Sequence, residues 1–233
     1  INWSDVSTSA FGMRVSPRGF AFDGRGASMF CNNDVMMYIA ALLASKFTTY
    51  ILNILNPTLT FNIENVAAIP VIIDKNKKKQ IEFTAADNIR LSKTDWDSFE
   101  TSWDFKKHPL LRNVSTISEA FTQWQAECDD RFNQLKANEE ELNRIFIDIY
   151  GLQDELTPEV EDKDVTVRKA DLQRDIKSLL SYAVGCMFGR YSLDVEGLAY
   201  AGGKWDSSKY QSYIPDADNV IPITDEEYLD DDI

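Results

Sequence analysis

The most regular pattern of apolar residues lies in the second half of the chain. From residue 117 to about 150, apolar side chains recur mostly at spacings of three and four, which predicts an amphipathic helix or helix pair ended by Gly151. Residues 164–190 carry a second stripe of the same spacing, including Val167, Leu172 and Ile176, and predict another helix. With a turn between them, the two helices predict an antiparallel helical arm.

The first half has a different pattern. Short β-favouring pieces alternate with Gly and Pro between Phe11 and Gly26, as in strands joined by tight turns. Residues 35–55 are apolar almost all the way round, which predicts a buried helix that Asp34 caps. Asn56-Pro57 ends this helix, because proline disfavours helical geometry in the residue before it.

Further strands are predicted beyond this helix. Residues 59–63 alternate between apolar and polar side chains, and residues 67–73 look like a second strand before the loop 74–80. Residues 81–116 show no clear period, so we expect an irregular segment with aromatic packing anchors. The pattern predicts an α+β fold with a small mixed domain over 1–116, a helical arm over 117–190, and a loosely structured acidic segment over 191–233.

Composition narrows the possible functions. The 233 residues, 44% of them hydrophobic, suffice for one large or two small domains. A net charge of −14 argues against a protein that coats nucleic acid nonspecifically, because such binding depends on Lys and Arg. The charge is uneven, however, since 13 basic residues meet 11 acidic ones up to Thr116, and 11 meet 27 after it. The first half is therefore able to contact an anion.

Other features bear on location and chemistry. The longest apolar run, 35–44, is shorter than the roughly 20 residues of a transmembrane helix, and no signal segment opens the chain, so we expect a soluble cytoplasmic protein. The chain starts at Ile1 and ends on the acidic run 225–233, which suggests a piece of a longer polypeptide. Three distant cysteines and a single histidine indicate neither a disulfide framework nor a metal site.

Basic residues are the candidate binding groups. Arg14, Arg18 and Arg25 lie in one turn-rich stretch, where they can grip phosphates or base edges, or instead be solvated or paired with Asp5 and Asp23. Gly24-Arg-Gly-Ala-Ser28 has the composition of a phosphate-binding loop without the spacing of a nucleotide fingerprint, and a plain turn is the simpler interpretation.

A second basic cluster follows later in the chain. The residues Lys77, Lys78 and Lys79 form a loop patch that can touch a DNA backbone, or simply face solvent.

No catalytic centre is recognisable. Asn56-Pro-Thr-Leu59 departs from the Asn-Pro-Pro-Tyr signature of amino-methyltransferases, because the second proline and the aromatic residue are replaced, and we interpret it as a helix stop. His108 is expected to be structural, and the carboxylates of Glu139-Glu-Glu141 to form a solvated helix face. A glycine-rich loop after a strand, as used for S-adenosylmethionine, is also missing.

Several segments, in order along most of the chain, carry a resemblance to a known family. They include Trp3-Ser-Asp-Val-Ser7, Pro17-Arg-Gly-Phe-Ala-Phe-Asp23, Asn56-Pro-Thr-Leu-Thr-Phe61, Asp95-Trp-Asp-Ser-Phe-Glu-Thr-Ser-Trp-Asp-Phe105, Asn138-Glu-Glu-Glu-Leu-Asn143 and Gly189-Arg-Tyr-Ser-Leu-Asp-Val-Glu-Gly-Leu198. These segments resemble the specificity region of PglX-like adenine-specific DNA methyltransferases. This family belongs to BREX phage-defence systems and is related to type II restriction-modification enzymes.

The resemblance implies a division of labour. A separate domain of the parent enzyme binds S-adenosylmethionine and methylates N6 of adenine, while this C-terminal region selects the double-stranded DNA sequence. It implies no cofactor site in this chain. The alternative is an interaction scaffold, in which the acidic helical half binds other proteins of the defence system without DNA contact. The resemblance assigns segments and not contacts, so the basic residues are candidates from charge and loop context alone.

Overall fold

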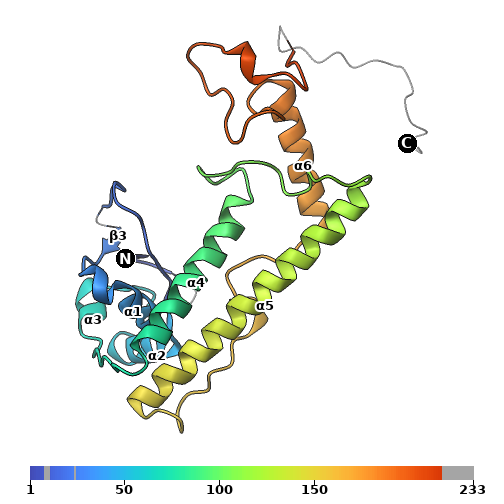
Figure 1. Cartoon of the computed structure of the whole chain (residues 1–233). Helices are drawn as coiled ribbons and strands as arrows, with labels where there is room; N and C mark the ends of the chain where they lie inside the picture. The colour runs from blue at the N-terminus through green and yellow to red at the C-terminus, as the bar shows by residue number, and fades with distance from the viewer. Residues whose placement is uncertain (8–10, 24, 217–233) are drawn as a thin grey trace. The chain divides into compact units, whose positions relative to one another are not determined.

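The computed structural model describes residues 1–7, 11–23 and 25–216, and they form two compact units. The first unit combines Ile1–Asp95 with Glu127–Lys169, and the second combines Trp96–Ala126 with the described residues from Ala170 onward. Together they contain a three-stranded antiparallel sheet and six α-helices, which confirms the predicted α+β class (Figure 1). The proposed domain borders at Thr116 and Arg190 stay a prediction.

A small sheet opens the first unit. Its strands are β1 (Asn2–Ser4), β2 (Met13–Arg14) and β3 (Gly26–Ser28), with β1 in the centre. Trp3 on β1 is buried against the ring of Phe11, and its Nε1 donates to the carbonyl of Phe61 at 2.8 Å. The expected strands between Phe11 and Gly26 are thus limited to β2 and the first residue of β3.

The apolar segment 35–55 forms two helices instead of one. α1 (Asn33–Ala44) and α2 (Lys46–Leu55) are bent by 69° at Ser45, whose backbone is extended. The hydroxyls of Ser45 and Thr48 both donate to the carbonyl of Leu42, so side chains satisfy the broken helix end. The structural N-cap is Asn32, so the expected Asp34 cap was wrong, whereas the stop at Asn56 is confirmed.

The two strands expected after Pro57 are not formed. α3 (Ile63–Ala67) occupies part of this region, and residues 70–74 are irregular. Tyrosine side chains bind this backbone in place of a neighbouring strand. Tyr150 Oη donates to the carbonyl of Pro70 and accepts from the amide of Ile72, and Tyr38 Oη donates to the carbonyl of Ile72. Side chains far away in sequence therefore override a β-favouring run.

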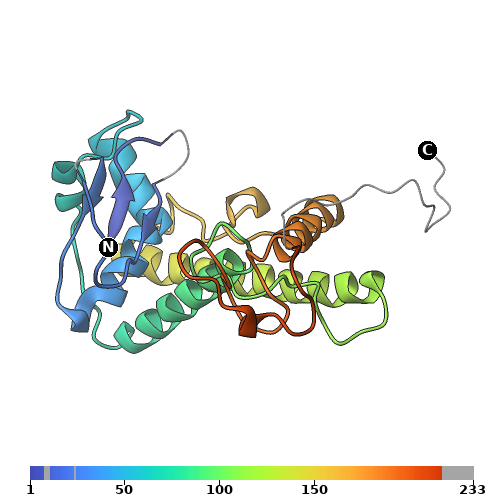
Figure 2. The same ribbon diagram turned by 90° about the horizontal axis from the view of Figure 1, so that it is seen from above.

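Two long helices contribute to the first unit. α4 (Lys78–Asp97) replaces the first part of the expected irregular segment 81–116, whereas residues 98–116 are irregular. α5 (Ile117–Tyr150) is a single helix, followed by Gly151 at φ +67° as predicted. Figures 1 and 2 show α4 beside the later turns of α5. Gln80 donates to Glu141 and Asn138 donates to Asp87, so these two stretches run antiparallel.

The segment 152–169, which is irregular apart from the 3-10 turn η1 (Asp162–Asp164), runs back along α5 in the first unit. Asn143 donates to the carbonyl of Pro158, and Lys136 forms an ion pair with Asp162. Buried Val165 and Val167 are two residues apart and pack in one cluster with side chains of α4 and α5. Their period of two explains why the helix expected from Asp164 begins only at Leu172, where Asp171 caps α6 (Leu172–Met187).

The second unit has its own aromatic core. Tyr182 and Tyr191 stack with ring centroids 4.9 Å apart, and Phe105 packs edge-on against both. Residues 191–216 contain no α-helix or strand, only the short 3-10 turn η2 (Ser207–Lys209). They are nonetheless held in place, since the Asp194 carboxylate accepts from the amides of Gln211 and Ser212. The acidic run 225–233 lies outside the described residues.

Helix length and apolar content bear on membrane insertion. Within residues 1–7, 11–23 and 25–216, no single helix is long and apolar enough to cross a membrane. α1 and α2 together have the length and composition of a membrane span, although they are bent by 69°. Both contribute buried side chains to the core of the first unit, including Tyr38, Leu42 and Phe47.

Candidate nucleic-acid interface

Arg14 and Arg18 are exposed on the sheet and its first long connection. Arg14 lies on the edge strand β2, opposite Asn2, and Arg18 lies in a turn of the β2–β3 connection. Among the residues that the structure describes, neither guanidinium forms an ion pair with a carboxylate. Both side chains therefore remain available to an external anion.

Arg25 has a different environment. Its Nη1 lies 2.9 Å from Oδ2 of Asp5, while the side chain remains 84% exposed. Such an exposed pair contributes little to stability, so it can open to an external anion at small cost. The ion pair between Arg25 and Asp5 that the sequence suggested is thus formed, whereas Asp23 binds backbone amides instead of an arginine side chain. Its Oδ1 accepts from the amides of Arg25 and Gly26, each at 2.9 Å.

These hydrogen bonds also settle the local shape of the glycine-containing segment. Gly26, Ala27 and Ser28 form β3 and pair with β1. The amide of Gly26 donates to Asp23, so it is not directed at an external phosphate. The described part of Gly24–Ser28 is therefore a turn and a strand, while Gly24 itself lies outside the described residues.

The three lysines do not form the expected loop patch. Lys77 precedes α4, and Lys78 and Lys79 belong to the first turn of that helix. Lys78 lies 3.5 Å from Glu82 at the i,i+4 position, whereas Lys77 and Lys79 are exposed. No helix was expected here from the sequence, and Ile81 supplies the first buried side chain of α4.

Three phenylalanines were not recognised as candidates from the sequence. Phe20, Phe22 and Phe30 are 68%, 64% and 78% exposed, and they occur within eleven residues of chain that also contain Arg25. The rings of Phe22 and Phe30 are 5.3 Å apart between centroids. The signal in the sequence was Phe20-Ala-Phe22 between two glycines, a place where phenylalanine has little prospect of burial.

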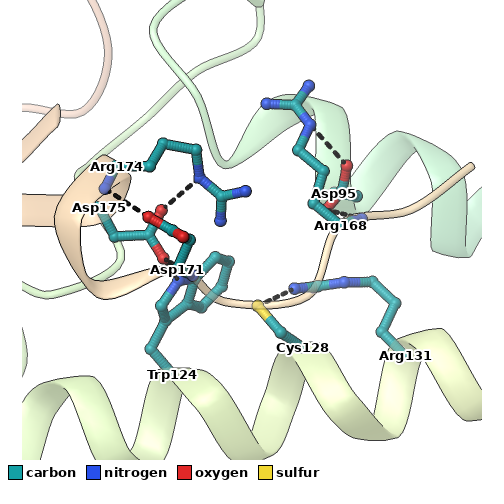
Figure 3. A network of polar contacts seen from close by, with 8 residues as sticks. All are labelled: Asp95, Trp124, Cys128, Arg131, Arg168, Asp171, Arg174 and Asp175. Carbon is teal, nitrogen blue, oxygen red and sulfur yellow. Dashed lines mark hydrogen bonds and ion pairs between the residues drawn. The ribbon is translucent and has the colours of Figure 1, made fainter.

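Buried carboxylates elsewhere serve structural roles (Figure 3). In the second unit, Asp175 accepts from Nε1 of Trp124 at 3.0 Å, from Nε of Arg174 at 2.7 Å and from the amide of Asp171 at 3.1 Å. In the first unit, Asp95 accepts from the amide of Arg168 and lies 3.6 Å from its Nε. These contacts hold the chain on either side of residue 170.

His108 is buried in the second unit, and its Nδ1 accepts from the amide of Leu110 at 3.2 Å. Burial lowers the pKa of His108 to about 4, with the nearby Asp175 opposing the shift. The imidazole is therefore neutral near pH 7 and is engaged with the backbone. This environment fits the structural role expected for it.

The glutamate run on α5 corrects another expectation. All three side chains are partly buried, and burial with the nearby Asp164 raises the pKa of Glu139 to about 7. Glu140 accepts from the amide of Val160, and Glu141 accepts from Gln80. The expected solvated face is thus covered by neighbouring segments of the first unit. Among the described residues, no three His, Cys, Asp or Glu side chains form a metal-binding group.

Comparison with known proteins relates the whole chain to two methyltransferases. No family model matches the chain. It is 51% identical over 239 residues to the adenine-specific methyltransferase PglX of Lacticaseibacillus casei (strain Zhang). This alignment covers 100% of the chain and 20% of PglX. It is 34% identical over 256 residues to the adenine-specific methyltransferase BrxX of Escherichia coli O9:H4 (strain HS), covering 99% of the chain and 21% of BrxX.

The chain is homologous over its full length to part of PglX and BrxX. It spans about a fifth of the length of these curated relatives. The similarity expected from the sequence is thereby confirmed at the level of homology to part of PglX. The matches assign no role to Arg14, Arg18, Arg25 or the three lysines, so their DNA contacts stay predictions.

Proposed function

We propose that this chain is part of an adenine-specific DNA methyltransferase of the PglX and BrxX type and contributes to recognition of its double-stranded DNA target. The observation that carries the proposal is the alignment of the entire chain with two adenine-specific methyltransferases. In this proposal S-adenosylmethionine and the catalytic residues belong to another part of the longer, cytoplasmic protein. This chain supplies DNA contacts and no methyl transfer.

The chemistry of the task allows such a division. A methyltransferase removes its target adenine from the helix into a pocket, while other side chains read base edges in the groove. Recognition and catalysis can thus occupy different regions of one protein. The sheet of the first unit offers Arg14 and Arg18 for this purpose, since both are exposed and have no carboxylate partner among the described residues.

Charge favours the amino-terminal part of the chain as the side that meets DNA. Residues up to Thr116 carry 13 basic and 11 acidic side chains, and the later residues carry 11 and 27. Several later carboxylates, including those of Asp154, Glu155 and Asp194, are exposed in segments outside the long helices. Such a surface repels phosphates, so it is expected to point away from the duplex.

The test compares DNA binding and methylation in the full-length protein. Arg14→Ala and Arg18→Ala are expected to weaken binding by about 1–3 kcal/mol for each lost base contact. If the lost contact is to a phosphate, the slope of log K against log salt instead falls by about 0.9 per arginine. Arg144→Ala is the control, because this arginine also lies on the surface but pairs with Glu141 on α5.

The methylated sequence supplies a second readout. Loss of a base contact is expected to relax the specificity at one position of the site, as seen by sequencing of modified adenines. The recognition role is refuted if the Arg14, Arg18 and Arg25 variants bind DNA with unchanged affinity and salt dependence and methylate an unchanged set of sites. The same result would remove these residues as DNA contacts.

A second candidate is a protein interaction scaffold within a phage-defence complex. One observation favours it, namely the exposure of Leu180, Val184 and Phe188 around a cavity of about 380 Å³ on α6. Replacing Leu180 and Val184 with Glu is expected to prevent complex assembly while DNA binding is retained. Deletion of 117–190 is a poor test, because α5 supplies residues to both compact units.

A further inference from the structure

The exposed phenylalanines of the first unit form an unusual surface for a folded chain. Phe20, Phe22 and Phe30 each leave about two thirds or more of the side chain in contact with solvent. We name these three residues the aromatic tip. Exposed apolar side chains that gather in this way mark a binding surface, because their burial in a partner is favourable.

Two arginines lie close to the aromatic tip in sequence. Arg18 lies two residues before Phe20, and Arg25 lies between Phe22 and Phe30 in sequence. The nearest acidic residue along the chain, Asp23, uses its carboxylate to accept from the backbone of the turn. Arg25 pairs with Asp5, but this exposed pair can open toward an external anion at small cost. Exposed phenylalanines with arginines nearby in sequence complement a partner that has an anionic exterior and a stacked apolar interior.

Double-stranded DNA has both properties. Its phosphates attract the arginines, and the faces of its bases are accessible to a side chain that separates two neighbouring base pairs. Phenylalanine is one of the residues that proteins use in this way, since its flat ring replaces part of the lost stacking. A protein partner fits less well, because the exposed guanidiniums would require carboxylates opposite them.

We propose that the aromatic tip enters the base stack of the target duplex as a wedge. Phe22 and Phe30 lie close enough to act together, with centroids 5.3 Å apart, and Phe20, two residues before Phe22 in sequence, is 68% exposed. This inference rests on the proposed function, because it assumes that the first unit meets DNA. It adds deformation of the duplex to the arginine contacts as a second source of specificity.

The experiment uses the full-length protein and duplexes that contain its methylated sequence. The fluorescent base 2-aminopurine is placed at one position after another, leaving out the adenine that is methylated, because its removal from the helix gives a signal of its own. The wild-type protein is expected to raise the fluorescence several-fold at one base step. A variant with Phe20, Phe22 and Phe30 all replaced by Ala is expected to lose this signal and to bind about tenfold more weakly.

Two further variants serve as controls. Phe83→Ala removes a phenylalanine of similar exposure, 77%, from α4, and is expected to leave the signal unchanged. Replacing the three tip residues with Leu is expected to restore most of the signal, because leucine also acts as a wedge. All of these side chains are exposed, so thermal denaturation midpoints should match that of the wild type.

The wedge is overturned if the wild-type protein binds its site without unstacking any base step, or if the alanine variant unstacks the DNA as the wild type does. It is also overturned if the variant loses a protein partner and keeps its DNA affinity. These outcomes are separate from failure of the proposed function, which is read from the arginine variants and the methylation pattern. Arginine-dependent DNA binding without unstacking would refute the wedge alone.

Discussion

Asp175 provides a sharp test of what holds the second unit together. Its carboxylate is 2% exposed and accepts from Trp124, Arg174 and the amide of Asp171. Replacing Asp175 with Ala removes one acceptor group from three donors at once. These donors come from α5, α6 and the residue that caps α6, so the substitution loosens the start of α6 from α5.

The expected change in the free energy of unfolding follows from burial and charge. Removing one partner of a buried ion pair lowers this free energy by about 3–5 kcal/mol. The Arg174 side chain is 36% exposed, so water can partly solvate the guanidinium after the change, and we expect a loss near the lower end, about 3 kcal/mol. Asp175→Asn keeps the shape and one acceptor oxygen, and is expected to lose roughly half as much.

The assay is urea unfolding combined with hydrogen exchange of peptides from α6. Exchange in α6 reports on the second unit even if the first unit remains folded. Asp130→Ala, at an exposed position on α5, is the matched control and should change stability by less than about 0.5 kcal/mol. A loss below about 1 kcal/mol for Asp175→Ala, with unchanged exchange in α6, would refute the anchoring role.

Two other predictions concern the same unit. The pKa of His108 is about 4 in the fold and about 6.5 when unfolded, so the unfolded chain takes up a proton first as the pH falls. The free energy of unfolding of the second unit should therefore fall by up to about 3 kcal/mol between pH 7 and pH 4. His108→Gln should reduce this pH dependence, as measured by urea unfolding at several pH values. An unchanged pH dependence in the variant would contradict the prediction. Gly185→Ala would place a Cβ atom 2.6 Å from the Tyr191 ring, so we expect the free energy of unfolding to fall by about 1–3 kcal/mol, as measured by thermal denaturation. Gly12→Ala, which meets no atom within 4 Å, should be close to neutral, and equal effects of both changes would contradict this account.

Local patterns predicted the elements whose stability is local. α5 was recognisable because its apolar residues recur at helical spacing and Gly151 takes up a positive φ after its end. α4 was missed because its fully buried apolar positions, Ile81, Ala85 and Leu91, are few within twenty residues. Its contacts with α5, such as those of Gln80 and Asp87, stabilise a helix that its own sequence pattern does not predict.

Elements that depend on distant residues were the least predictable. The β-branched run before Asp74 looks like a strand, yet Tyr38 and Tyr150 take its backbone hydrogen bonds. The structure places Arg18 and Arg25 in turns and Arg14 on β2, all three exposed, and their pairing depends on residues elsewhere in the fold. Only the structure distinguishes Arg25, paired with Asp5, from Arg18.

The arrangement of the units along the chain has a consequence for synthesis. Neither unit is a continuous piece of sequence, since the second unit draws on 96–126 and on residues from Ala170 onward. On the ribosome, all of the first unit has been made once Lys169 emerges, while residues 96–126 still lack the rest of their own unit. Aromatic side chains such as Trp124 and Phe105, which are buried in the complete fold, then remain exposed until the later residues are made. A pause in translation near residue 170 would therefore prolong the stage at which the nascent chain is most prone to aggregate.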